Sequence, residues 1–303
     1  MITSDKPEAS FLIPAYNCDD TIRETLLSAL NQTVRNIEVV VVDDGSTDNT
    51  KSEIESINDN RLIYIYKENG GISSALNLGL KYCRSEFIAR LDSDDLAHED
   101  RIEMQLKEFA KNPSLVLIGT GVDYIDSNSK LVGKLFPIYF KSLEKIFFSK
   151  GNIYQHPSVM FRKEAVINVG LYDDNLSGFF EDYYLWAKLK EFGQCKIIPA
   201  SLTSYRISEG QITNWLPSDE YKKLMLKIVK SGNYTNDELK QLSLLKKRDK
   251  VNSKNISSNR IESASNNIFY RIDSLLNVFF PKSYSYYIVC TLKNILLMFK
   301  SGN

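Results

Sequence analysis

The chain has 303 residues, of which 43% are apolar and 25% charged, the composition of an ordinary globular protein. This length allows one large domain or two modest ones, and it excludes the small folds that depend on disulfides. The 38 basic and 38 acidic residues cancel, but residues 221–303 hold 15 Lys and Arg against 5 Asp and Glu. The balanced total therefore combines an acidic body with a basic C-terminal region, and we expect a boundary near residue 220.

No segment of the sequence has the pattern of a membrane span, a secretory signal or a redox motif. The longest stretch without a charged residue is the 12 residues of Asn69–Leu80, whereas a bilayer needs about 20 apolar residues. Residues 1–8 include three charged residues and no apolar run follows them, which argues against a secretory signal. The cysteines are too far apart for a CxxC motif. We therefore expect reduced thiols and a cytoplasmic location.

Short β-branched runs alternate with amphipathic stretches over the first 120 residues, which predicts βαβ units. Residues 37–42 are almost continuously apolar, as in a central strand with helices on both faces. The sequence thus predicts a doubly wound α/β sandwich. The expected strands are Ala9–Ile13, Ile37–Val42, Leu62–Tyr66, Phe87–Leu91 and Leu115–Gly119, and the expected helices are Asp19–Gln32, Thr50–Ile57, Ile72–Cys83 and Glu99–Lys111.

The alternation becomes less regular after about Asp123. We expect a hairpin or loop through Ser127–Lys134, a strand near Val159–Arg162 and a helix over Glu181–Phe192. This part of the chain is predicted to be mixed α+β. Residues 221–260 predict surface helices, because Lys, Ser and Asn surround a stripe of leucines.

Three of the expected strands end in polar or acidic residues. In an open α/β sheet, ligands bind at the carboxyl ends of the strands, so these side chains should meet at one edge. Clustered carboxylates repel one another unless a cation neutralises them. Asp92 and Asp94 are two residues apart and would point to the same side of an extended strand. Mg²⁺ and Mn²⁺ take such oxygen ligands and leave positions for phosphates, so we expect a nucleoside diphosphate ligand.

Two alternatives for this region are weaker. The Asp-Ser-Asp-Asp run that starts at Asp92 could merely cap the helix expected from Glu99. A dehydrogenase or an NTPase would need GxGxxG after the first strand or GxxxxGK[ST], and the sequence contains neither.

Six motifs occur in a fixed order along about residues 9–212. They are IPAYN from Ile13, VDDGSTD from Val42, NGG from Asn69 with Ala75 and Asn77, RLDSDD from Arg90, HPSVMFR from His156, and FEDYYLW from Phe180. Together they strongly resemble the family 2 glycosyltransferases of the GT-A fold. The resemblance implies a Rossmann-like αβα sandwich with a mixed, mostly parallel sheet. We expect a catalytic domain over residues 1–220 and a basic helical C-terminal region over 221–303.

For the donor, the resemblance implies that Tyr16 stacks on the nucleobase and that Asp44 accepts a hydrogen bond from uracil. Asp92 would lie near the ribose and the metal, and Asp94 would ligate the metal, Mn²⁺ or Mg²⁺. The implied nucleotide-sugar residues are Pro14, Tyr16, Asp43, Asp44, Asn69 and Asp92, and the implied metal ligands are Asp94 and Asp92, with His156 as an additional candidate.

His156 is a candidate because of one departure from the family pattern. Ser208 stands where members often have a histidine, after a Tyr-Arg pair, that contacts the metal or the diphosphate. His156 is then either a replacement ligand or a structural histidine, and a lone histidine is more often structural.

The resemblance also identifies Asp182 as the general base that deprotonates the acceptor hydroxyl, with Glu181 positioning the acceptor. A carboxylate base and a divalent cation act at opposite ends of one displacement, which inverts the anomeric centre. The alternative is that the two acids only stabilise a helix N-terminus.

These residues predict an inverting, metal-dependent glycosyltransferase. It would move a hexose or N-acetylhexosamine from a UDP-sugar to a glycan acceptor, lipid-linked, in the biosynthesis of a surface polysaccharide such as O-antigen or capsule. Two other functions stay open, a polyprenyl-phosphate sugar transferase and a non-catalytic nucleotide-sugar-binding protein.

The composition of the basic C-terminal region predicts that it binds a membrane surface or packs on protein. Lys282, Lys293 and Lys300 would share one face of an otherwise apolar helix. Such a helix fits an anionic surface, here the inner face of the cytoplasmic membrane, to which the protein would bind peripherally. The alternative is a helix packed on the domain or at a homodimer interface. Nucleic acid is not an expected partner, because residues 221–260 lack interleaved aromatic residues.

Overall fold

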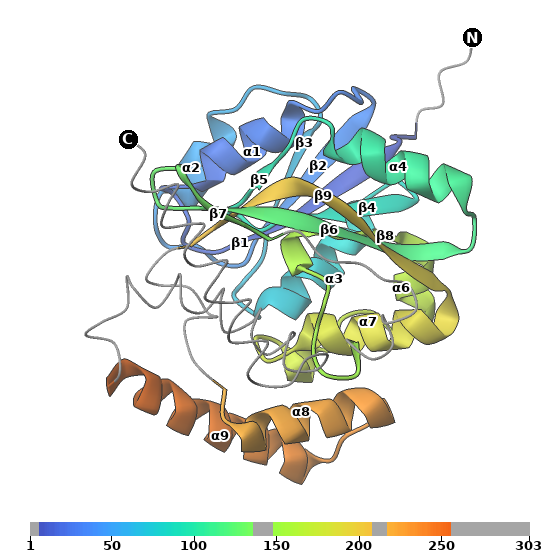
Figure 1. Ribbon diagram of the computed structural model, residues 1–303. Coiled ribbons are helices and arrows are strands. Elements are labelled where there is room, and N and C mark those ends of the chain that lie inside the picture. Colours follow the sequence, from blue (N-terminus) through green and yellow to red (C-terminus); the bar gives the residue numbers. More distant parts are fainter. Residues whose placement is uncertain (1–5, 136–147, 208–216, 256–303) are drawn as a thin grey trace, which may run out of the picture. The chain divides into compact units, whose positions relative to one another are not determined.

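The computed structural model describes residues 6–135, 148–207 and 217–255 (Figure 1). Ser208 and the three lysines of the expected C-terminal helix lie outside these residues. The chain divides into two compact units, Met1–Asn214 with Asp219–Leu242, and Trp215–Ser218 with Ser243–Asn303. The boundary expected near residue 220 stays a prediction.

The first part of the sheet is parallel, as the sequence predicts. Strands run in the order β3-β2-β1-β4, and Phe11 on β1 pairs with Val39 on β2 and with Ala89 on β4. Every residue of β1 and β2 is buried, so both faces of these strands are covered. The elements are β1 (Ala9–Ala15), α1 (Ile22–Leu30), β2 (Ile37–Asp43), α2 (Thr50–Glu55), β3 (Leu62–Tyr66), α3 (Ile72–Tyr82) and β4 (Phe87–Arg90).

The sheet continues beyond β4 with strands of both directions, in the order β8-β6-β9-β5, and β7 pairs with β6. The hairpin of β6 and β7 confirms the turn expected near Ser127, whereas β9, which runs parallel to β6, is not expected from the sequence. The elements are β5 (Leu96–Ala97), α4 (Arg101–Lys111), β6 (Leu115–Ile125), β7 (Leu131–Leu135), η2 (His156–Ser158), β8 (Met160–Arg162), α6 (Lys163–Asn168), η3 (Asp174–Leu176), α7 (Glu181–Phe192) and β9 (Gln194–Arg206).

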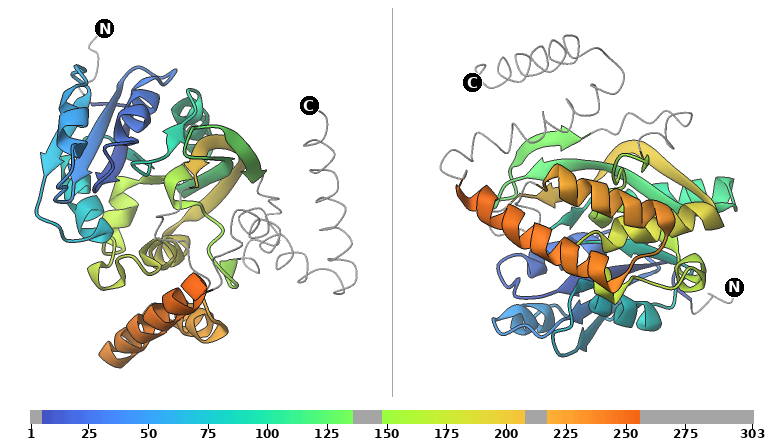
Figure 2. Two further views of the ribbon diagram at one scale, coloured as in Figure 1. Left: turned by 90° about the vertical axis from the view of Figure 1, so that its left-hand side faces the viewer. Right: turned by 90° about the horizontal axis from the view of Figure 1, so that it is seen from below.

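Helices cover both faces of this nine-stranded sheet. Figure 1 shows α1, α2 and α4 on one face and α3, α6 and α7 on the other. In the left view of Figure 2, the chain crosses the sheet from the blue strands at one end to the green and gold strands at the other. The helix α3 packs closely, because a Cβ on Gly79 would collide with Leu12 and Val42. The fold is the predicted αβα sandwich.

Two helices follow the sheet, α8 (Asp219–Ser231) and α9 (Asn236–Asn255). The turn between them is held by two hydroxyls within the first unit. Tyr184 donates to the carbonyl of Gly232 at 2.6 Å, and Tyr234 donates to the Asp173 carboxylate at 2.6 Å. The helical C-terminal extension expected from the sequence therefore begins within the unit that holds the sheet.

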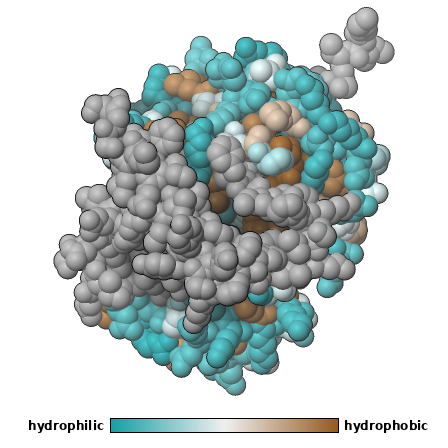
Figure 3. All heavy atoms as spheres, in the orientation of Figure 1, coloured by the Kyte–Doolittle hydropathy of each residue, from teal (hydrophilic) through white to brown (hydrophobic). Residues whose placement is uncertain are grey.

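The visible described surface in Figure 3 is mostly hydrophilic, with scattered apolar atoms. None of the helices within residues 6–135, 148–207 and 217–255 combines the length and hydropathy needed to cross a bilayer.

Candidate active site

The ends of β1 and β2 meet, as the sequence predicts. The backbone N–H of Asp44 donates to the carbonyl of Ala15 at 2.8 Å. The Asn17 N–H donates to the Ser46 hydroxyl at 2.9 Å, and the Asn17 side-chain oxygen accepts from the Thr47 N–H at 2.8 Å. These reciprocal bonds fix the two strand-end loops against each other.

The loop after β4 joins the same edge through α1. The carbonyl of Ser93 accepts hydrogen bonds from the hydroxyls of Thr21 and Thr25, each at 3.0 Å. Since β1 pairs with both β2 and β4, all three polar strand ends lie at one edge of the sheet.

Two of the predicted nucleotide-binding residues differ in exposure. Pro14 is buried within β1, whereas Tyr16, just after the strand, is 52% exposed. A half-exposed aromatic ring at a strand end is suited to stack on a planar base.

Asp44 is buried and holds the neighbouring loop in place. Its carboxylate accepts from the N–H groups of Gly70 at 2.9 Å and Gly71 at 2.8 Å, and from the Lys67 ammonium at 2.6 Å. A carboxylate offers about four acceptor positions, so one remains for a ligand. Asn69 is exposed in this loop, and its backbone nitrogen would lie 2.7 Å from a Cβ on Gly45, whose φ is +81°. Glycine therefore allows the two loops to approach.

Asp43 is held in the same way. One of its oxygens accepts from the Ser46 N–H at 2.8 Å and the other from the Tyr64 hydroxyl at 2.8 Å. The structure thus places Asp43 at the strand end as a loop anchor, beside Asp44.

Asp92, Asp94 and Asp95 form an acidic cluster in which ligand oxygens lie within 4.8 Å of one another. Asp95 is 1% exposed, and its Oδ1 accepts from the backbone N–H of Arg206 at 2.8 Å. Its Oδ2 is buried and has no hydrogen-bond partner among the described residues. Burial, together with the charges of Asp92 and Asp94, raises the pKa of Asp95 well above its usual value. Three close oxygen donors with one orphaned oxygen suit a hard divalent cation.

Sequence reasoning selected Asp92 and Asp94 as ligands and missed Asp95. It also gave no role to Arg206, which organises the acidic cluster. The Arg206 side chain donates to the carbonyl of Asp94 at 2.7 Å, to Glu24 at 2.7 Å and to the Ser129 hydroxyl at 3.0 Å. The Tyr-Arg pair that precedes Ser208 marks this position in the sequence, but not the partners of the Arg206 side chain.

Glu181 and Asp182 lie in the first turn of α7. Burial raises the pKa of both, and for Glu181 the charge of Asp182 adds to the effect. Asp182 Oδ1 accepts from the Tyr183 N–H at 2.7 Å, and Oδ2 accepts from the Asn152 side-chain amide at 2.6 Å. Asn152 is a further residue that the sequence reasoning missed.

A buried arginine links the acidic cluster to the α7 carboxylates. Arg90 on β4 is 1% exposed and forms an ion pair with Asp92. Its positive charge also acts on Glu181 and Asp182, whose pKa values it lowers against the effect of burial. Arg90 Nε and Nη1 have no hydrogen-bond partner in the part of the chain that the structure describes. The acidic cluster and the α7 carboxylates therefore both lie within the electrostatic range of one buried side chain.

His156, the additional metal candidate, lies in an aromatic cluster. Its Nε2 is 3.1 Å from the Tyr172 hydroxyl, and its ring packs edge-on against Trp186. Burial and the charge of Arg90 lower the pKa of His156 well below its usual value, so the ring is neutral at neutral pH. It is not part of the acidic cluster, and its role as a ligand stays a prediction.

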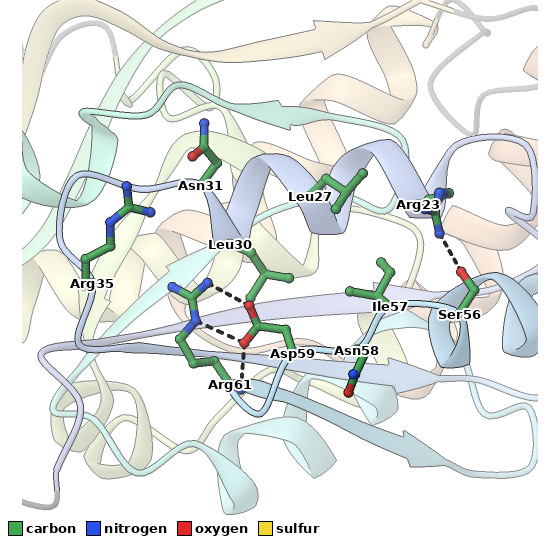
Figure 4. Close-up of a pocket in the computed structure, with 10 residues that line it drawn as sticks. All are labelled: Arg23, Leu27, Leu30, Asn31, Arg35, Ser56, Ile57, Asn58, Asp59 and Arg61. Atoms are coloured by element: carbon green, nitrogen blue, oxygen red, sulfur yellow. Dashed lines mark hydrogen bonds and ion pairs between the residues drawn. The ribbon is translucent and has the colours of Figure 1, made fainter.

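A separate groove lies beside α1 (Figure 4). Its single carboxylate, Asp59, is already paired with Arg61 at 2.8 Å, so it offers no acid for proton transfer. The groove has a volume of about 410 Å³ and is lined by Arg23, Leu27, Leu30, Asn31, Arg35, Ser56, Ile57, Asn58, Asp59 and Arg61. The strand-end site is therefore the candidate active site.

Known proteins are similar to this chain in sequence and in fold. The sequence model of glycosyl transferase family 2 matches residues 10–170, more than half of the chain. An uncharacterized glycosyltransferase of Rickettsia typhi is 35% identical over 218 residues, which are 69% of this chain and 66% of the relative. Chondroitin synthase of Escherichia coli is 34% identical over 244 residues, 79% of this chain and 34% of the synthase. The chain spans less than two thirds of either relative's length.

A solved structure gives the same result for the fold. TarS 1–349 of S. aureus, crystallised with UDP-GlcNAc, matches with a TM-score of 0.60 at 20% identity, over 78% of this chain and 70% of that chain. The predicted GT-A sandwich is confirmed. Because the family model covers more than half of the sequence, the chain belongs to glycosyltransferase family 2.

Proposed function

We propose that this chain transfers a hexose or N-acetylhexosamine from a UDP-sugar to a hydroxyl of a glycan, with inversion at the anomeric carbon. One observation carries the proposal: the buried Arg90 is paired with Asp92 of the acidic cluster and acts electrostatically on the α7 carboxylates. A group that binds the leaving diphosphate and a group that takes a proton thus share one site.

The donor half of the proposed reaction uses the strand ends of the parallel sheet. Tyr16 stacks on the base, Asp44 accepts a hydrogen bond from uracil at its remaining acceptor position, and Asn69 lines the site beside it. Asp92 lies nearest the ribose. The UDP-GlcNAc bound by TarS supports this class of donor.

Asp92, Asp94 and Asp95 would hold Mn²⁺ or Mg²⁺. When bound, the cation neutralises charge on the departing diphosphate. The acidic cluster fits this role because its oxygens are close together and Arg206 fixes the Asp94 backbone. The ion in turn balances a cluster in which carboxylates raise one another's pKa.

Asp182 acts as the general base and Glu181 positions the acceptor. Burial makes Asp182 hold a proton more tightly than an exposed aspartate does, and a stronger base removes a hydroxyl proton more effectively. A single base and no covalent nucleophile give one displacement, and therefore inversion.

For the acceptor, we propose a growing, lipid-linked surface polysaccharide of the O-antigen or capsule type. The similarity to chondroitin synthase supports a polysaccharide acceptor. The excess of Lys and Arg after residue 220 supports peripheral binding to an anionic membrane, where such an acceptor would be anchored.

A donor screen tests the proposal. Purified protein with Mn²⁺ is incubated with a panel of UDP-sugars, with and without lipid-linked and free glycans, and release of UDP is followed. We expect one donor to release UDP, with the activity lost in EDTA and in Asp94→Ala. Glu99→Ala, which removes an exposed acid outside the cluster, is the matched control. Metal-dependent UDP binding without turnover of any donor would instead indicate a nucleotide-sugar-binding protein.

A further inference from the structure

The Asp182 carboxylate is held by a side chain far from it in sequence. Asn152 lies 30 residues before Asp182, and its amide Nδ2 donates to Asp182 Oδ2 at 2.6 Å. No motif of the sequence singled out this residue. A short bond to a carboxylate is charge-assisted and stronger than a bond between neutral groups.

We propose that Asn152 is a positioning residue that holds Asp182 in the orientation and the ionised state needed to accept the acceptor's proton. The inference rests on the proposed role of Asp182 as the base. Asn152 itself would contact neither substrate, and it would act through the carboxylate that it holds.

The orientation of the Asn152 amide follows from its own backbone contact. Its Oδ1 accepts from the Tyr154 N–H at 3.0 Å, which assigns the oxygen to that side and directs the NH₂ group to Asp182. A flipped amide would place two acceptors together at the carboxylate and two donors together at Tyr154.

The two Asp182 oxygens each carry one fixed donor. Oδ1 accepts from the Tyr183 N–H at 2.7 Å, and Oδ2 accepts from Asn152. The backbone N–H of Asp182 also acts on its carboxylate, which leaves about one of its four acceptor positions for an incoming hydroxyl. The two donors therefore fix the plane of the carboxylate without saturating it, which is what a proton acceptor requires.

The charged and titratable groups around Asp182 come from two elements and one connecting segment. Glu181 precedes it on α7, Arg90 acts from β4, and Tyr172 lies in the segment before η3. Glu181 disfavours the Asp182 anion, whereas Arg90 and the Asn152 amide favour it. The hydrogen bond of Asn152 thus opposes the effect of burial on the base.

The test is the pH profile of kcat/KM for Asn152→Asp. This change keeps the size of the side chain and the acceptor for Tyr154, but it places a second carboxylate against Asp182. Two such groups share a proton. We expect the acidic limb of the profile to move up by about one pH unit or more, so that activity falls about threefold or more at pH 6.5 and recovers partly at pH 9.

Asn112→Asp is a matched control. Asn112 has the same local arrangement, because its Oδ1 accepts from the N–H two residues later, of Ser114, at 3.0 Å and its Nδ2 donates to a side chain at 3.0 Å. That partner is the neutral Gln194, so this change should leave the pH profile where it is.

A second variant and a binding measurement separate positioning from folding. Asn152→Ala should lower kcat about tenfold, with unchanged affinity for UDP by calorimetry and the acidic limb displaced in the same direction. A profile of Asn152→Asp that superimposes on the wild type, or Asn152→Ala with full kcat, would overturn the inference. Full activity of Asp182→Asn would instead refute the proposed base, and the two failures are therefore distinguishable.

Discussion

Two pairs of adjacent carboxylates differ in what surrounds them. Asp43 and Asp44 are 1% and 4% exposed, yet backbone and side-chain donors occupy their oxygens. The donors are Ser46, Tyr64, Lys67, Gly70 and Gly71. Asp44 is paired with the Lys67 ammonium, whereas the donors to Asp182 are a backbone N–H and the neutral Asn152 amide, and burial raises the pKa of Glu181 and Asp182. Similar side chains thus anchor loops in one place and bind a proton more tightly than usual in the other, because the groups around them differ.

The largest effect should come from removing the base. We expect Asp182→Asn to lower kcat about 10³-fold or more, because the acceptor hydroxyl then lacks a proton acceptor. Affinity for UDP, measured by calorimetry, should stay within about twofold because Asp182 lies outside the donor loops. Loss of UDP binding together with kcat would show that the two carboxylate pairs are not functionally separate.

A change in the pair that anchors the loops, Asp43 and Asp44, should lower the affinity for UDP more than it lowers kcat. In Asp44→Asn, an NH₂ group replaces an oxygen that accepts from Lys67, Gly70 or Gly71, so donors face each other and the loop loses its anchor. We expect UDP affinity to fall about 10- to 100-fold, in line with the cost of leaving buried donors unpaired. At saturating donor, kcat should change far less. A fall in kcat with unchanged UDP affinity would contradict the assignment of Asp44 to the donor.

The acidic cluster gives a smaller and metal-specific effect. Arg206→Lys keeps the charge but cannot donate at once to Asp94, Glu24 and Ser129. We expect the Mn²⁺ concentration for half-maximal activity to rise about tenfold, as for other residues that orient metal ligands. Direct Mn²⁺ titration by electron paramagnetic resonance should show the same shift. Lys130→Arg, in the nearby β6–β7 turn, is the control and should leave Mn²⁺ binding unchanged.

The parallel half of the fold could be predicted from sequence because its signals are local. The apolar run of β2 identifies a buried strand, and the polar residues after β1, β2 and β4 identify the ligand edge. The strand β9 could not be predicted in this way, since Pro199, Ala200 and Ser201 interrupt its apolar pattern and its pairing with β6 contains register shifts. Its partner lies some 80 residues away, and only tertiary contacts make it a strand.

The sequence predicted only those site residues that lie within a recognisable motif. Asp92 and Asp94 were found by their spacing, whereas Asn152, Arg206 and the ligand role of Asp95 depend on which side chains the fold brings together. Asn152 donates across 30 residues and Arg206 across 112. Neither a period nor a motif encodes such pairs, so positioning residues are found only in the structure.

The smallest expected effect is on stability. Its sign should differ between a buried carboxylate with a raised pKa and one with a lowered pKa. Glu181 has a raised pKa, so the folded state binds its proton more tightly than the unfolded state does. Stability is therefore lost as pH rises from about 4 through the raised pKa. Glu181→Gln removes this loss and should stabilise the protein at pH 8 by about 1 kcal/mol or more, roughly 2–4 °C in Tm. At pH 4 the variant and the wild type should unfold at similar temperatures.

Glu38 supplies the matched control with the opposite sign. Burial alone would raise its pKa, but hydrogen bonds from Ser10 and Arg84 outweigh burial and lower it. Its contribution to stability is present above the unfolded pKa and is lost as pH falls through the lowered value. Glu38→Gln should therefore destabilise the protein at pH 8, where Glu181→Gln stabilises it. Thermal unfolding that shifts both variants in the same direction at pH 8 would show that the hydrogen bonds to Glu38 do not outweigh the effect of its burial.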